Sequence, residues 1–168
     1  AEGWLGPPDV SVLDAQVLLV RRYLGGSGPA TRAEIANWAG LPVRSVAAAL
    51  DRIDHVTYAA EDGSTLVDLP HAPLPDPASP VPVQFLPTWD ATLLVHARRA
   101  RILPEAYRPK VFNTKTPHSV PTFLVDGSVA GTWRYEDGRV ELTEFDPLSR
   151  RVRREAEQAA DALAAFHR

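Results

Sequence analysis

A cluster of basic residues near the middle of the chain is the best candidate for binding chemistry. Between residues 98 and 115 the only acidic residue is Glu105, and the basic residues are Arg98, Arg99, Arg101, Arg108, Lys110 and Lys115. Tyr107 and Phe112 are interleaved with these cations. Cations bind phosphate oxygens and aromatic rings stack on bases, so the pattern favours a nucleic-acid strand as ligand. A charged, solvated face that pairs with an acidic part of the chain is the alternative.

The charge of the chain is unevenly distributed. The 168 residues carry a net charge of -3, but residues 1–80 have 5 basic and 10 acidic residues, whereas residues 81–168 have 13 and 11. Phosphate binding needs a local excess of cations. We therefore expect the phosphate-binding residues in the second half, and select Arg98, Arg99, Arg101, Lys110 and Lys115.

Other kinds of site find little support in the sequence. Cysteine is absent, which excludes disulfides, thiolate catalysis and cysteine-based zinc sites. The histidines His55, His71, His96, His118 and His167 do not recur at helical metal-ligand spacing. No phosphate-binding loop, nucleophile elbow or dinucleotide glycine motif is present. We therefore assign no catalytic residue, metal or cofactor, and interpret Asp90 as a helix cap.

The first part of the chain, residues 5–69, predicts three short helices. Thr31 and Glu34 form a capping-box pattern that begins the second helix, and Gly40 predicts its end. A third helix is expected to follow Pro42 and run to Ile53.

Two strands, His55–Ala60 and Thr65–Leu69, are predicted to follow the third helix. Three helices and a hairpin in this order are typical of a winged helix-turn-helix. On the exposed face of the third helix, Arg44 and Arg52 would contact a DNA groove. A winged helix used only for packing is the alternative, since Asp51 and three alanines share this helix.

Residues 70–87 contain seven prolines and predict a proline-rich connector. Proline lacks a backbone N–H and restricts φ, so this stretch should form neither a helix nor a central strand. A short strand over residues 83–86 is expected at its end.

The last part, residues 88–168, predicts a β-meander closed by a helix. Asp126-Gly127 and Asp137-Gly138 are hairpin signals between alternating strands, and Asp146-Pro147 would begin the C-terminal helix. The predicted fold class is α+β: a winged helix-turn-helix followed by a β-meander or barrel-like unit with a C-terminal helix.

Two blocks of the sequence resemble a known family. Residues 84–101 follow its pattern of Leu-Pro-x-aromatic-Asp and then His-x-Asp/Arg-Arg-x-Arg, and residues 120–133 contain its Val-Asp-Gly and Ala-Gly-Thr-Trp elements. The chain thus resembles the bacterial winged helix DNA-binding domain-containing family, which includes DNA glycosylases that unhook interstrand crosslinks. The resemblance implies tandem winged helices, a β-barrel-like end and, in the glycosylase branch, a catalytic Gln-x-Gln. No Gln-x-Gln occurs here.

These observations lead to one main expectation and two rivals. We expect a DNA-binding winged-helix protein with double-stranded DNA as partner, forming the C-terminal part of a larger DNA-repair-like protein whose N-terminal part is missing. The rivals are the non-catalytic portion of a DNA glycosylase, and a protein-interaction or packing module without DNA affinity. No apolar run is long enough to span a membrane, and a cytoplasmic location is expected.

Overall fold

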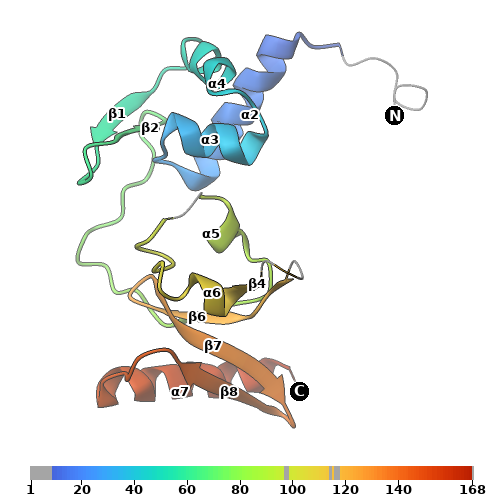
Figure 1. Ribbon diagram of the computed structural model, residues 1–168. Coiled ribbons are helices and arrows are strands. Elements are labelled where there is room, and N and C mark those ends of the chain that lie inside the picture. Colours follow the sequence, from blue (N-terminus) through green and yellow to red (C-terminus); the bar gives the residue numbers. More distant parts are fainter. Residues whose placement is uncertain (1–8, 97–98, 114, 116–117, 168) are drawn as a thin grey trace. The chain divides into compact units, whose positions relative to one another are not determined.

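The computed structural model describes residues 9–96, 99–113, 115 and 118–167 (Figure 1). By their contacts these residues divide into two compact units. The first comprises residues up to Pro75 together with Val95 and His96, and the second comprises Asp76–Leu94 and the described residues from Arg99 onward. The division falls within the proline-rich stretch; the separate connector at residues 70–87 remains a prediction.

Three helices begin the first unit. They are α2 (Val12–Ser27), α3 (Arg32–Ala39) and α4 (Val43–Leu50). The predicted capping box is confirmed: the Thr31 hydroxyl accepts the Glu34 N–H, and the Glu34 carboxylate accepts the Thr31 N–H. Gly40 ends α3 with a left-handed φ of 64°, a conformation that glycine adopts without strain. The third helix ends at Leu50, three residues before the predicted end.

A two-stranded antiparallel sheet follows the helices. It consists of β1 (Val56–Ala59) and β2 (Thr65–Asp68). Ala30, between α2 and α3, extends the pairing through an antiparallel bridge to Val67. The core of this unit includes the fully buried side chains Val20, Ile35, Val46, Leu50 and Val67.

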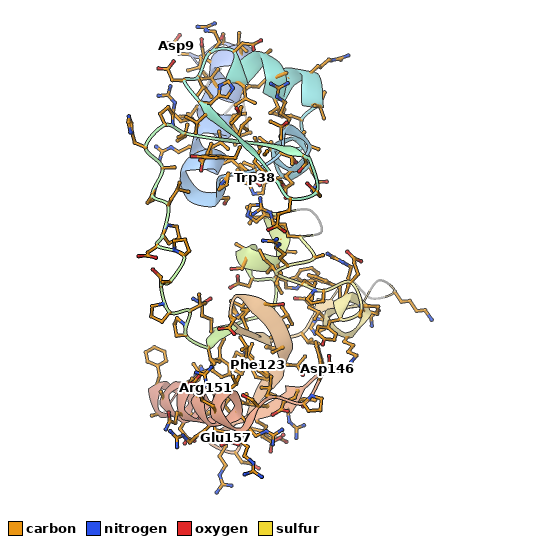
Figure 2. The ribbon with its side chains drawn as sticks, turned by 90° about the vertical axis from the view of Figure 1, so that its left-hand side faces the viewer. Asp9, Trp38, Phe123, Asp146, Arg151 and Glu157 are labelled. Atoms are coloured by element: carbon orange, nitrogen blue, oxygen red, sulfur yellow. The ribbon has the colours of Figure 1, made fainter. Side chains whose placement is uncertain are left out.

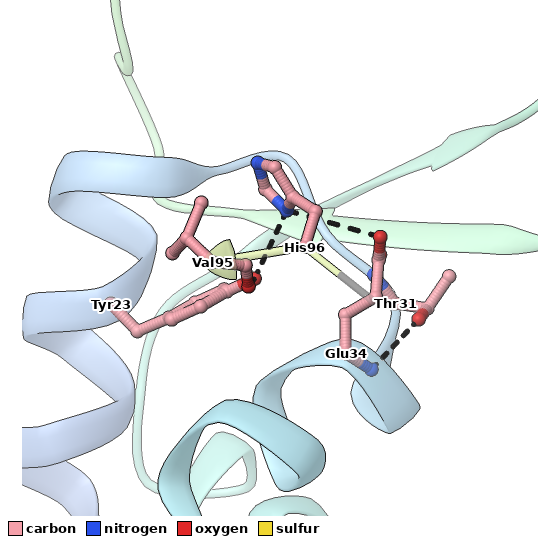
Figure 3. A network of polar contacts seen from close by, with 5 residues as sticks. All are labelled: Tyr23, Thr31, Glu34, Val95 and His96. Atoms are coloured by element: carbon pink, nitrogen blue, oxygen red, sulfur yellow. Dashed lines mark hydrogen bonds and ion pairs between the residues drawn. The ribbon is translucent and has the colours of Figure 1, made fainter. Parts of the chain in front are cut away.

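A polar network joins residues 95–96 to the helices of the first unit (Figure 3). The Tyr23 hydroxyl donates a hydrogen bond to the Val95 carbonyl and lies 3.2 Å from Nδ1 of His96. The same Nδ1 lies 3.8 Å from the carboxylate of Glu34, whose other oxygen belongs to the capping box. These contacts tie His96 to α2 and α3.

The second unit is built on a four-stranded antiparallel sheet. Its strands, in the order β3 (Gln84–Leu86), β6 (Thr122–Val125), β7 (Ser128–Glu136) and β8 (Arg139–Glu144), include the predicted meander. The Asp-Gly turns are confirmed: Asp126 and Gly127 have φ of 49° and 76°, and Asp137 and Gly138 have 49° and 77°. Strand β3 lies at the sheet edge, the position that a proline-flanked strand can occupy.

The C-terminal helix α7 (Arg150–Phe166) packs against β8. Its buried positions are Ala156, Ala160 and Ala164, spaced four residues apart on one face. Its exposed side chains include Arg151 and Glu157 (Figure 2). The prediction that Asp146 caps this helix is wrong: the Ser149 hydroxyl accepts the Val152 N–H instead. Asp146 accepts a hydrogen bond from the Tyr107 hydroxyl.

Shorter elements complete the second unit. They are α5 (Ala91–Leu94), α6 (Arg108–Val111), β4 (Phe112–Asn113) and β5 (His118–Ser119). Asp90 accepts the Thr92 N–H, which confirms it as a cap of α5. The described residues thus combine helices with antiparallel sheets. Among them, no helix combines the length and apolar character needed to cross a bilayer.

Candidate nucleic-acid interface

The segment from Tyr107 to Ser119 presents most of the described cations of the central cluster. The single turn of α6 begins at Arg108 with Pro109 as its second residue, and it passes directly into β4. Val111 is fully buried and fixes the turn to the core of the second unit. Strand β5 pairs antiparallel with β4, so that His118 lies opposite Asn113. The hairpin therefore brings residues from both ends of the segment together.

Described residues between Glu105 and Val120 line a cleft of about 780 Å³, which we call the basic cleft. It is lined by Glu105, Arg108, Pro109, Lys110, Val111, Phe112, Asn113, Lys115, His118 and Val120. Three of these residues are cationic at neutral pH, and one is acidic. An excess of cations around a cleft concentrates anions in it.

Arg108 is the most enclosed of the three cations. Its side chain is 24% exposed, and its Nε lies 3.5 Å from Oε1 of Glu105. The Nε atom is buried, and no described residue accepts a hydrogen bond from it. Its Cζ lies 5.9 Å from the centroid of the Phe112 ring. A guanidinium can donate two parallel hydrogen bonds to two oxygens of a phosphate group.

Lys110 is held above two aromatic rings. Its Nζ lies 4.7 Å from the centroid of the Phe145 ring and 5.3 Å from that of Tyr107. The Tyr107 hydroxyl donates a hydrogen bond to Asp146, which raises the pKa of the Tyr107 hydroxyl because its ionised form could not donate that bond. The Tyr107 and Phe145 rings therefore hold the Lys110 cation at the cleft. The raised pKa keeps Tyr107 neutral.

Lys115 and His118 belong to the β4–β5 hairpin and are exposed. The Lys115 backbone N–H donates a hydrogen bond to Oδ1 of Asn113, a local turn that fixes the lysine backbone. Lys115 and Lys110, both selected from the sequence, thus line one cleft.

The other selected residues lie elsewhere or outside the description. Arg98 is outside the described residues. Arg99 and Arg101 are not among the described residues that line the basic cleft; Arg99 accepts backbone hydrogen bonds from Ile102 and Leu103 in a turn.

The two arginines proposed for groove contact belong to the first unit. Arg44 is exposed on α4. Arg52 follows α4, and its Nη2 lies 3.9 Å from Asp14 Oδ1, with both side chains more than half exposed. Such an exposed pair is weak, so Arg52 remains free to exchange Asp14 for a phosphate.

The selection from the sequence omitted Arg108 and His118. The spacing of Arg108 and Phe112, four residues apart, was the available signal for a cation beside an aromatic ring. No local signal marked His118, because its place depends on the pairing of β4 with β5.

Comparisons with known proteins add a family and a fold. The model of a family described as DNA glycosylase AlkZ-like matches residues 1–166. Among solved structures, the chain is similar to a Streptomyces sahachiroi DNA glycosylase AlkZ, with a TM-score of 0.76 and 20% identity. The match covers 95% of this chain and 45% of that chain, so this chain spans less than half of the solved relative. The comparison with curated proteins finds no match.

Proposed function

Because the chain belongs to the AlkZ-like DNA glycosylase family, we propose that it is a DNA-binding protein with a role in DNA repair. In this proposal the basic cleft holds the phosphate backbone of duplex DNA. The observation that carries the proposal is the convergence of Arg108, Lys110 and Lys115 on one cleft with a single carboxylate, Glu105.

The first unit supports the proposal through its topology. We propose that it is a winged helix, with α4 as the helix that approaches a groove and the β1–β2 hairpin as the wing. The bridge between Ala30 and Val67 favours a winged helix. It pairs the chain between α2 and α3 with β2, the second strand of the hairpin. Arg44 and Arg52 are then the groove-facing cations. Alanines on α4 offer only methyl contacts, so we assign base recognition a small share of the affinity.

The basic cleft accounts for binding by neutralising phosphates. Each cation that contacts a phosphate releases a counterion, so affinity should fall as the salt concentration rises. Arg108 suits two oxygens of one phosphate, whereas Lys110 and Lys115 act as point charges. Arg99 and Arg101 would extend the phosphate path beyond the cleft.

Fluorescence anisotropy with a labelled duplex of about 20 base pairs tests this function over a range of salt concentrations. We expect saturable binding that weakens with salt, with a slope of about 0.9 per phosphate contact. Arg108→Ala/Lys115→Ala should reduce both affinity and slope. Arg154→Ala, which removes one charge from exposed α7, is the control. Absence of a complex at about 50 mM salt would contradict duplex binding.

Base excision is the second candidate function, and the family match favours it. The absence of a Gln-x-Gln in the sequence favours a non-catalytic role for this stretch. Incubation with duplexes that carry modified bases, followed by counting of abasic sites, separates the two. Abasic sites formed at the rate of the protein-free control would contradict excision by this chain. If the chain neither binds duplex DNA nor excises bases, a packing or protein-interaction module is favoured.

A further inference from the structure

Trp89 has an unusual backbone conformation for a bulky residue. Its φ is 59°, in the left-handed region that side chains with a Cβ rarely occupy. Its backbone N–H donates a hydrogen bond of 2.6 Å to the hydroxyl of Ser119, which is buried in β5. Strand β3 ends at Leu86 before it, and the Asp90 cap of α5 follows it. The surrounding structure therefore holds Trp89 in an unfavourable conformation, a feature that concentrates at functional sites.

The conformation does not bury the side chain. The indole remains 48% exposed. Its ring centroid lies 6.5 Å from that of Phe112, and the two ring planes are inclined by 44°. Trp133 is a contrast: it is partly buried, and its indole N–H donates a hydrogen bond to the Leu86 carbonyl. Trp89 instead forms an aromatic surface that water reaches.

Phe112 connects this surface with the basic cleft. It lines the cleft and carries the Arg108 guanidinium near its ring. A ligand that contacted both the Trp89 ring and the cations of the cleft would need a flat, apolar group next to an anion. A nucleotide has this combination, because its base offers a π-face and its phosphate a negative charge. Inside a duplex the faces of the bases are already stacked on their neighbours, so an exposed indole stacks there on a base that has left the helix.

We propose that Trp89, supported by Phe112, is a stacking platform for an unpaired DNA base whose neighbouring phosphates occupy the basic cleft. The inference rests on the proposed DNA binding and specifies its substrate class: duplexes that contain a bulged or otherwise unpaired nucleotide. Arg108 and Lys115 supply affinity for any duplex, and Trp89 supplies the preference for the unpaired base.

The test compares a perfect duplex with the same duplex carrying one bulged nucleotide. We expect the chain to bind the bulged duplex roughly 5- to 150-fold more tightly, the range of one base–aromatic stack. Trp89→Gly should bind both duplexes equally. Glycine adopts positive φ without strain, so this variant retains the local backbone. Tyr135→Ala, which removes another exposed aromatic of the second unit, is the matched control and should keep the preference.

Intrinsic fluorescence gives a second readout that does not depend on the glycine variant. Stacking should quench the Trp89 indole when the bulged duplex binds, and Trp89→Phe should lose that quenching. A bulge preference that persists in Trp89→Gly, or full quenching in Trp89→Phe, would overturn the platform while leaving duplex binding intact. Equal binding of both duplexes by the original chain would overturn it too. Failure of the chain to bind either duplex would instead contradict the proposed function.

Discussion

The Nζ of Lys110 lies 4.7 Å from the centroid of the Phe145 ring, with the ring of Tyr107 on the same cation. A lysine in water loses rotamer freedom when it binds an anion. Contact with two rings restricts this side chain beforehand through cation–π attraction. Lys110 therefore lines the basic cleft with less side-chain entropy left to lose than a lysine without ring contacts has.

We predict that Lys110→Ala weakens duplex binding about 5- to 10-fold. It should also lower the salt slope by about 0.9, because one phosphate contact is lost. Phe145→Leu keeps the charge and removes the ring, so it should weaken binding less and leave the slope unchanged. Anisotropy titrations at several salt concentrations measure both quantities. An unchanged slope in Lys110→Ala would remove Lys110 from the interface.

A second prediction ranks the two groups of cations selected from the sequence. Lys115 lines the basic cleft, whereas Arg99 and Arg101 are not among the described lining residues. Arg108→Glu/Lys115→Glu should therefore weaken binding more than Arg99→Glu/Arg101→Glu, which makes the same change in charge. The same titrations compare them at one salt concentration. A larger loss from the Arg99/Arg101 pair would move the main phosphate site away from the cleft.

Sequence reasoning succeeded where the structural cause is local. The capping box of Thr31 and Glu34, the stop at Gly40 and the Asp126-Gly127 turn each depend on a few adjacent residues, and all are confirmed. The cap at Asp146 failed because its carboxylate bonds Tyr107, 39 residues away in the chain. Such a partner leaves no periodic signal in the sequence.

The candidate site was predictable in composition but not in geometry. The basic cluster indicated Lys110 and Lys115, yet the β4–β5 hairpin that brings His118 and Lys115 to one cleft was not predicted. Two adjacent pairs form this hairpin, which is too short for an alternation of apolar and polar residues to emerge. The hydrogen bond from Trp89 to Ser119 joins residues 30 positions apart, so the sequence did not predict it either.

The ion pair between Glu144 and Arg153 predicts a pH dependence of stability. Glu144 accepts hydrogen bonds of 2.7 and 2.9 Å from the guanidinium and so joins β8 to α7. The bond from Arg153 lowers the pKa of Glu144 below its usual value of 4.5. Because the folded chain has the lower pKa, the stabilisation is present above about pH 4.5 and is lost as the pH falls through the folded pKa.

Thermal unfolding followed by circular dichroism between about pH 3 and pH 6 checks this expectation. Glu144→Gln should lower the melting temperature at pH 6 and flatten its decline towards acid pH. Glu155→Gln, which disrupts the exposed pair with Arg151 within α7, should change little. Identical pH profiles for Glu144→Gln and the original chain would show that the pair adds no stability.

Gly131 provides a stability prediction for the sheet of the second unit. A Cβ at this position would overlap the Thr143 carbonyl oxygen and the ring of the fully buried Phe123. The backbone oxygen belongs to the paired strand β8 and cannot move without breaking that pairing. Gly131→Ala should therefore destabilise the chain by about 1–3 kcal/mol, the usual range for overpacking.

Gly138→Ala is the control for Gly131→Ala. Gly138 has a φ of 77°, and nothing lies within 4 Å of an added Cβ, so its substitution strains the backbone without a collision. We expect a loss of about 1–2 kcal/mol there. Denaturant unfolding of both variants measures the difference. The Gly131 variant should also disturb the near-ultraviolet signals of Phe85, which packs on Phe123, and of Trp133, which packs on Phe85. A Gly131→Ala variant as stable as the original chain would mean that β7 and β8 separate more readily than their register indicates.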